Sequence, residues 1–261
     1  MSAGAREGEG RFVSMASRPM GEGGGGKAAG DLGPSAGPLA RLRAWKALCR
    51  AAGVCRACGG MDGARPVLSD RNGPVGARVL FVGEAPGRRG ADRTRVPFLG
   101  DASGDCFDRL LRSAGLSRDQ VFVTNAVLCC PRREGSNRRP TSQEIANCGR
   151  FLRDTIEVVQ PAVVATLGRV ALEAVWRVCG CGGPGSSWSH PARRGPTDGP
   201  PRLADAVGRI IRCPGFVLVP LYHPSPRVLH AFRHMEQQER DIRAVAKALA
   251  LVSRRRYVAF A

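Results

Sequence analysis

The chain has 261 residues and a formal net charge of +18, from 40 basic and 22 acidic side chains. No apolar run approaches the roughly 20 residues of a membrane-spanning helix, so we expect no membrane role. The ten cysteines do not indicate a disulfide scaffold, because a chain of this length can bury a full core without such cross-links. The excess of positive charge favours a polyanionic partner, with nucleic acid first among the candidates.

Composition divides the chain into a tail, one domain and a short basic end. Residues 1–40 are rich in Gly, Ala, Ser and Pro without apolar periodicity, which predicts a disordered tail. Residues 41–252 have the length of a single domain, and residues 253–261 form a basic C-terminal end. Within the domain, residues 179–214 are expected to be an irregular surface insertion.

Apolar patterning predicts strands that alternate with helices. The predicted strands are short apolar runs at residues 79–82, 121–127, 162–167 and 216–221. The predicted helices cover residues 38–52, 103–114, 142–159, 168–178 and 234–252. This alternation, with right-handed crossovers, indicates an α/β fold: a single three-layer α/β/α sandwich with a central four-stranded parallel sheet.

Chemically distinctive residues follow three of the predicted strands. Gly83 to Gly87 form a Gly-Glu-Ala-Pro-Gly turn after the first strand, Asn125 stands near the end of the second, and a His-Pro-Ser-Pro segment begins at His223 after the fourth. The carboxyl ends of parallel strands meet at one edge of a sheet, where α/β folds bind their ligands. These residues are therefore expected to share one site.

Four cysteines have a spacing that suits a metal or an iron-sulfur cluster. Cys55 and Cys58 form a C-x2-C pair, Cys129 follows the second predicted strand, and Cys148 lies in the helix after it. Four thiolates from separated segments can enclose a 4Fe-4S cluster or a structural zinc ion.

The motifs together resemble those of a known enzyme family. The GEAPG turn at 83–87, the Pro97-Phe98 pair, the TNAVLCCP segment at 124–131 and the HPSP segment at 223–226 occur in this order. The order resembles the iron-sulfur uracil-DNA glycosylases, types 4 and 5 of the uracil-DNA glycosylase superfamily. The turn is similar to type 4, whereas the following loop, ADRTRVPFLGD at 91–101, is similar to type 5.

The resemblance implies a uracil-DNA glycosylase-like fold, a structural 4Fe-4S cluster and a role for each motif residue. The cluster ligands would be Cys55, Cys58, Cys129 and Cys148, with Cys130 as an alternative to Cys129 and zinc as an alternative to the cluster. Phe98 would stack on an extruded uracil, Asn125 would read its edge, and His223 would donate a hydrogen bond to uracil O2. Further substrate-binding residues would be Gly83, Ala85, Ser225 and Arg227.

The acidic residues of this chain depart from the type 4 pattern. Type 4 enzymes carry an acidic residue a few positions after the turn, where this chain has Gly90 and Ala91. Type 5 enzymes can carry an Asp in the loop, and by spacing it falls on Asp92. We therefore expect Asp92 to position the attacking water, with Glu84 in support.

The function implied is removal of uracil from DNA to leave an abasic site, in DNA repair. The partner would be single- or double-stranded DNA containing uracil, the protein a monomer, and its location intracellular with DNA, in a nucleus, nucleoid or organelle. Two alternatives keep the same fold: a protein that binds damaged or single-stranded DNA without catalysis, and a glycosylase for other deaminated bases such as hypoxanthine or xanthine.

Overall fold

The computed structural model describes residues 36–61, 63–182 and 199–258. The expected disordered tail lies almost wholly outside these residues, as does the 183–198 part of the expected insertion. The helix expected over residues 38–52 is present as α1 (Pro38–Gly53).

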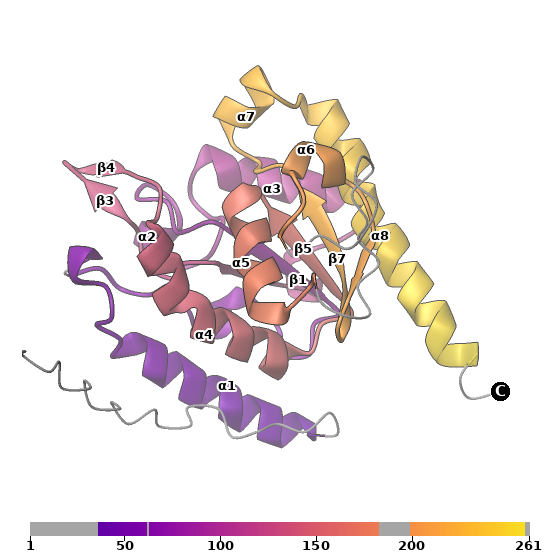
Figure 1. Ribbon diagram of the computed structural model, residues 1–261, viewed down its shortest axis with the longest axis horizontal. Helices are drawn as coiled ribbons and strands as arrows, with labels where there is room; N and C mark the ends of the chain where they lie inside the picture. Colours follow the sequence, from indigo (N-terminus) through magenta and orange to yellow (C-terminus); the bar gives the residue numbers. More distant parts are fainter. Residues whose placement is uncertain (1–35, 62, 183–198, 259–261) are drawn as a thin grey trace, which may run out of the picture.

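A five-stranded sheet of order β2-β1-β5-β7-β6 forms the middle layer (Figure 1). Its four parallel strands coincide with the predicted apolar runs and are almost completely buried: β1 (Val79–Gly83), β2 (Val121–Asn125), β5 (Val163–Leu167) and β7 (Phe216–Leu221). The sequence predicts only these four. The structure corrects the number, because β6 (Ile211–Cys213) adds a short antiparallel strand beside β7.

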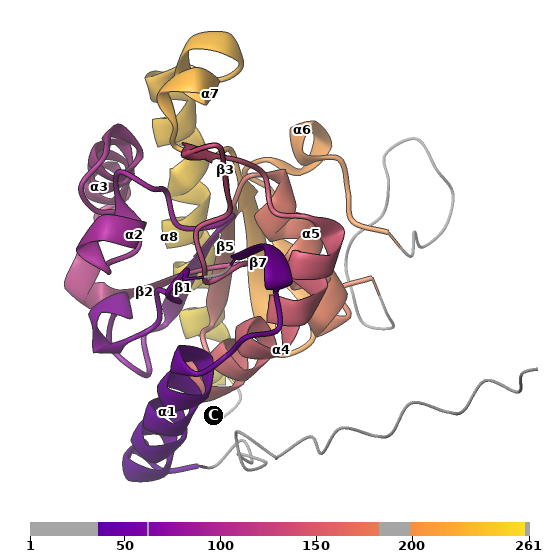
Figure 2. The same cartoon turned by 90° about the vertical axis from the view of Figure 1, so that its left-hand side faces the viewer.

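Helices cover both faces of the sheet, which confirms the three-layer α/β/α architecture. Side chains of alternate strand residues such as Leu80 and Val82 pack on α1, α4 (Ser142–Val159) and α5 (Arg169–Cys179). Phe81 and the other alternate residues pack on α3 (Ala102–Ser113) and α8 (Met235–Val258). The period of two along each strand thus builds two cores, one on each side of the sheet. Figures 1 and 2 show the two helical layers from perpendicular directions.

The loop before β1 covers the open edge of β2. A 3-10 turn, η2 (Asp70–Asn72), carries Asn72, whose side-chain amide donates to the Val123 carbonyl at 2.7 Å. Trp45 of α1 donates its indole N–H to Asp70 at 2.9 Å. The Asn72 contact satisfies a carbonyl of β2 that would otherwise offer an edge to another chain, and the Trp45 contact ties the same turn to α1.

The segment 179–214, expected to be irregular, includes two short regular elements in its described part. Residues 199–214 contain a helical turn, α6 (Leu203–Ala206), and strand β6, in which burial alternates along Ile211, Arg212 and Cys213. A three-residue strand among Gly and Pro is too short to give a periodic signal. The C-terminal boundary also moves, because α8 continues through residues 253–258.

The remaining elements lie around the carboxyl edge of the sheet. They are α2 (Ala91–Thr94), α7 (Pro226–Ala231) and a small hairpin of β3 (Arg132–Arg133) and β4 (Ser136–Asn137), which projects from the body of the structure (Figure 1). Two further 3-10 turns, η1 (Gly59–Met61) and η3 (Arg118–Gln120), precede β1 and β2. Within the described ranges, no helix is both long and apolar enough to cross a lipid bilayer.

The close packing of Gly73 on β2 yields a stability prediction. Gly73 has φ +127, and a Cβ there would lie 2.3 Å from the Val121 carbonyl oxygen. Gly73→Ala should lower the free energy of unfolding by about 3 kcal/mol through strain and the clash with backbone. Gly115→Ala is the control, because Gly115 has φ +68 but open space around it, and should cost about 1 kcal/mol. Urea unfolding of both variants measures the difference, and equal losses would contradict the packing.

Candidate active site

The parallel register brings the strand ends to one edge of the sheet. Gly83 pairs with Asn125, and Leu167 pairs with Leu221, so the residues that follow β1, β5 and β7 start at the same level. A cavity of about 770 Å³ opens at this edge. Its wall includes these motif residues: Glu84, Ala85, Phe98, Asn125, His223, Ser225 and Arg227.

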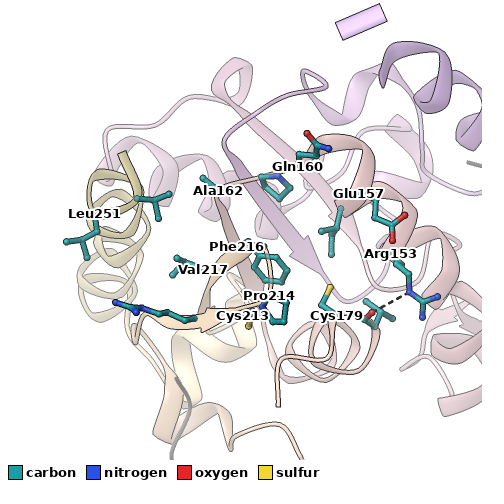
Figure 3. Close-up of a pocket in the computed structure, with 16 residues that line it drawn as sticks. Arg153, Glu157, Gln160, Ala162, Cys179, Cys213, Pro214, Phe216, Val217 and Leu251 are labelled. Carbon is teal, nitrogen blue, oxygen red and sulfur yellow. Dashed lines mark hydrogen bonds between the residues drawn. The ribbon is translucent and has the colours of Figure 1, made fainter. Parts of the chain in front are cut away.

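A larger cavity, of about 910 Å³, lies at the opposite edge, where β5 and β7 begin (Figure 3). Its described wall is formed by residues such as Ile156, Cys179 and Phe216, and it includes none of the motif residues. The residues expected from the sequence to carry chemistry therefore line the smaller of the two cavities. We take the smaller cavity as the candidate site, because convergent polar groups and not volume indicate a catalytic site.

Three residues from separate segments form the floor of the candidate site. A Cβ at Gly83 would lie 2.4 Å from Asn125 Oδ1 and 2.7 Å from Phe98 Cε2, so both side chains pack directly on the glycine backbone. The Phe98 and His223 rings are 5.5 Å apart with planes inclined by 38°. An aromatic face, an amide and an imidazole are thus brought together, as the sequence predicts for Phe98, Asn125 and His223.

The Asn125 amide is buried yet uncommitted. The residue is only 2% exposed. Its side-chain amide makes no hydrogen bond to any residue that the structure describes. An amide carries both donors and an acceptor, so Asn125 can read the edge of a planar ligand in this cavity.

His223 is held in its neutral form by its surroundings. Burial among protein atoms lowers the pKa of His223 to about 4, although the nearby Asp101 carboxylate opposes this shift. A neutral imidazole has one N–H donor and one acceptor nitrogen. The backbone N–H of Ser225 donates to the His223 carbonyl at 2.8 Å, which shapes the turn that presents the ring.

The cavity contains two carboxylates, and only one of them was expected. Glu84 is half-buried, and burial raises its pKa while Arg139 and Arg169 oppose the shift. Asp101 caps α3 by accepting from the Gly104 N–H at 3.0 Å, and its other oxygen lies against Gly87 and Gly90. The sequence does not single out Asp101 as a site residue, because an N-cap position indicates where a helix begins and not that its carboxylate lines a cavity.

The structure does not bring Asp92 into this cavity. Asp92 lies on α2, where one carboxylate oxygen is 3.5 Å from Arg95 and the other is bound by Arg132. It lines a separate, smaller cavity with Arg65 and Cys130. Its expected role as the residue that positions water therefore has less geometric support than a role for Glu84.

The other residues expected to bind substrate all lie in or beside the cavity. Gly83 lies beneath the floor rather than in the wall, and Ala85 follows it at the edge of the cavity. The Ser225 hydroxyl caps α7, accepting from the Val228 N–H at 3.4 Å. Arg227 is exposed on α7. Three further arginines line the wall, namely Arg138, Arg139 and Arg169, of which Arg138 pairs with Glu144 and Arg169 with Glu173.

The four predicted ligand cysteines form one group away from the cavity floor. Cys129 is close enough to Cys55 and Cys58 for their charges to interact, and Cys148 interacts with all three. Hydrogen-bond donors also approach these sulfurs: Asn147 Nδ2 lies 3.5 Å from Cys58 and the Leu128 N–H 3.4 Å from Cys148. Among the described residues, no set of three or more His, Cys, Asp or Glu is arranged to hold a single metal ion.

Cys130 belongs to a different environment from these four. Its thiol is influenced by Arg132, Asp92 and Arg88 and by none of the four cysteines. Cys129, and not Cys130, is therefore the thiol that lies near Cys55, Cys58 and Cys148.

Comparison with known proteins is consistent with this geometry. The uracil DNA glycosylase superfamily matches residues 71–249. A type-4 uracil-DNA glycosylase of Thermotoga maritima is 43% identical over 100 residues, which is 38% of this chain and 50% of that protein. A type-5 uracil-DNA glycosylase of Pyrobaculum aerophilum is 32% identical over 167 residues, covering 59% of this chain and 64% of that protein.

A third relative, a type-5 uracil-DNA glycosylase of Mycobacterium leprae, is 31% identical over 188 residues, or 66% of this chain and 74% of that protein. The match to the first two relatives spans between half and two thirds of their length. Both types are matched, as the mixed motifs predict. From the strand-end cavity and the extent of the superfamily match together, we conclude that this chain belongs to the uracil DNA glycosylase superfamily.

Proposed function

We propose that the chain is a DNA glycosylase that hydrolyses the N-glycosidic bond of uracil in DNA and leaves an abasic site. The observation that carries the proposal is the meeting of Phe98, Asn125 and His223 in one cavity at the carboxyl edge of the sheet. Each of the three supplies something that excision of a planar base requires.

Binding of the extruded base would use Phe98 and Asn125. Stacking on an aromatic ring recovers on the order of 1–3 kcal/mol per base, which offsets part of the cost of leaving the DNA stack. The uncommitted Asn125 amide would then pair with the polar edge of uracil, so that a base without complementary groups leaves the amide unsatisfied.

Departure of the base would depend on His223. Negative charge collects on uracil O2 as the glycosidic bond breaks, and a fixed N–H donor stabilises it by roughly 3 kcal/mol, by analogy with oxyanion holes. Since the pKa of His223 is about 4, the ring donates as a neutral imidazole and is not a general acid at neutral pH.

A carboxylate would stabilise the positive charge on the sugar and orient the attacking water. Glu84 is the better-placed residue in this structure, because it lines the cavity. Asp92, the expected residue, is bound by Arg95 and Arg132 outside it. The presence of Glu84 and Asp101 in the wall also argues against the alternative of a binding protein that has lost its catalytic carboxylates.

The partner proposed is DNA containing uracil, bound by a monomer inside the cell. Arg227 and the arginines of the wall would contact phosphates, which makes binding sensitive to salt. The described wall contains no lysine, so no Schiff base with the sugar is proposed and the strand would remain uncut.

We propose that Cys55, Cys58, Cys129 and Cys148 hold a 4Fe-4S cluster. When bound, such a group would supply cross-links and no step of the hydrolysis. Cys148 lies in α4 and Cys129 lies four residues after the end of β2, so their ligation would tie the segment around Cys55 and Cys58 to the domain. The basic hairpin begins three residues after Cys129 and would be anchored by the same bonds.

Base release tests the function and its carboxylate together. Anaerobically purified protein should release uracil from a single-stranded oligonucleotide under single-turnover conditions, and His223→Ala should be much slower. Glu84→Gln should slow release roughly a hundredfold or more, because it removes the carboxylate proposed to orient the water. Asp92→Asn should retain most of the rate, since Asp92 does not line the cavity.

Alkali-labile abasic sites give the readout, and hypoxanthine and xanthine oligonucleotides test the wider base range. A larger loss in Asp92→Asn than in Glu84→Gln would return the catalytic role to Asp92. No release from any of the three bases, with DNA binding intact, would reject the glycosylase.

The neutral state of His223 predicts a particular dependence on pH. The unfolded chain binds this proton near pH 6.5, whereas the folded chain binds it only near pH 4. Stability from this group is therefore fully present above pH 6.5 and is lost as the pH falls through the window down to about 4. NMR titration of the His223 ring should give a midpoint of about 4, and His223→Gln should flatten the stability profile in that window. A midpoint near 6.5 would contradict the account.

The thiol grouping predicts which cysteine binds iron. Cys129→Ser should lose iron, brown colour and stability, whereas Cys130→Ser should retain all three, because Cys130 lies beside Arg132 and Asp92 instead. Iron and zinc analysis with visible spectroscopy measures the outcome. Loss of iron in Cys130→Ser alone would reverse the assignment, and zinc in place of iron would reject the cluster.

A further inference from the structure

Phe98 has a backbone conformation that a bulky residue rarely adopts. Its φ is +52, in the left-handed region, where a non-glycine residue costs of order 1–3 kcal/mol unless its surroundings fix it. The residue is 8% exposed, and its ring packs between the Gly83 backbone, His223 and Phe107, whose ring centroid is 5.0 Å away. The orientation of this ring therefore depends on whatever holds residue 98 in that conformation.

One guanidinium, that of Arg118, contacts the backbone on both sides of this position. Arg118 Nη1 donates to the Pro97 carbonyl at 3.0 Å, and Nη2 donates to the Phe98 carbonyl. These are the two carbonyls that flank the N–H and Cα of residue 98. A planar guanidinium with fixed donor directions can hold two such acceptors, whereas an ammonium cannot match both.

Arg118 is itself fixed by α3. Its Nε donates to Asp108 Oδ1 at 2.6 Å, and its Cζ lies 5.3 Å from the centre of the Phe107 ring. Phe107 is the ring on which Phe98 leans, so the same guanidinium touches the backbone of Phe98 and its aromatic support. On the other side, a Cβ at Gly104 would lie 2.5 Å from the Phe98 carbonyl oxygen, so α3 leaves this carbonyl little room to move.

We infer that Arg118 is a positioning residue of the base pocket: it holds Phe98 in the left-handed conformation that turns the ring toward the base. The inference rests on the proposed function for its effect on catalysis. Arg118 is absent from the cavity wall, so it acts through Phe98 and not by touching the base. Arg118 stands at the start of η3, and β2 follows directly and ends at Asn125. The segment that holds Phe98 in place is therefore continuous with the strand that carries Asn125.

The test uses the full chain with Arg118→Met, which keeps the apolar stem, and Arg118→Lys, which keeps the charge. Arg109→Met is the matched control, because Arg109 is an exposed α3 arginine that pairs with Glu239 at 2.7 Å. Neither residue of this pair lines the cavity. Asp108→Asn serves as a milder second variant if Arg118→Met folds poorly, since it loosens the guanidinium without removing it.

Arg118→Met should slow single-turnover release of uracil roughly 10- to 100-fold at saturating enzyme, as expected for a misplaced binding group. Its affinity for the oligonucleotide should equal that of Arg109→Met. Arg118→Lys should recover only part of the rate, because charge alone does not fix the two carbonyls. In a Phe98→Leu background, Arg118→Met should add no more than about a twofold loss, since both changes act through the same ring.

A second readout does not need activity. In protein with labelled phenylalanine, the Phe98 ring signals, identified by their loss in Phe98→Leu, should shift in Arg118→Met and not in Arg109→Met. The inference would be overturned if Arg118→Met left the Phe98 ring signals unchanged. It would also be overturned if Arg118→Met slowed release by the same factor in the Phe98→Leu background as in the unmutated chain. If the unmutated chain releases no uracil, the proposed function fails, and the ring signals still decide the role of Arg118.

Discussion

The site depends on the absence of a side chain at Gly83. A Cβ at this position would meet Asn125 at 2.4 Å and the Phe98 ring at 2.7 Å, so no other residue allows the two side chains to converge at the end of β1. Because Gly83 pairs in register with Asn125, the backbone of one strand becomes the floor on which the amide of the next strand lies. The aromatic ring then covers the same glycine from the loop. The lack of a Cβ at Gly83 thus leaves room for both side chains, and the neighbouring strands and loops form the rest of the cavity wall.

Several residues around this floor are in energetically unfavourable states. Phe98 is held in an unfavourable backbone conformation, His223 is kept neutral by burial, and the pKa of Glu84 is raised by burial despite two arginines. Such features destabilise a fold unless packing fixes them, and they gather where a ligand repays the cost. The rest of the domain supplies that packing, since two apolar cores hold the parallel strands whose ends carry these residues. The basic wall adds the attraction for a polyanion that the net charge predicts.

Features set by local pattern could be predicted from the sequence, and features set by side-chain pairing could not. The four parallel strands follow from their apolar runs, and the helix at Ser142–Val159 follows from its apolar spacing and from Thr141, which forms a capping box with Glu144 three residues later; both are confirmed. The meeting of Asn125 and His223 follows from their places after parallel strands. In contrast, nothing in the sequence shows that Asp92 pairs with Arg132, that Asp101 enters the cavity, or that Phe98 takes a positive φ, because each depends on contacts between distant segments. Strand β6 was missed because three residues carry no measurable period.

The most direct measurement for the central claim is a crystal structure of the protein with an oligonucleotide that carries a non-hydrolysable uridine analogue. The account predicts that the base leaves the stack, lies against the Phe98 ring, directs its polar edge at Asn125 and places O2 at the His223 ring. A base seated elsewhere, for example in the cavity at the opposite edge beside Phe216, or bound without contact to Phe98 and His223, would contradict the account.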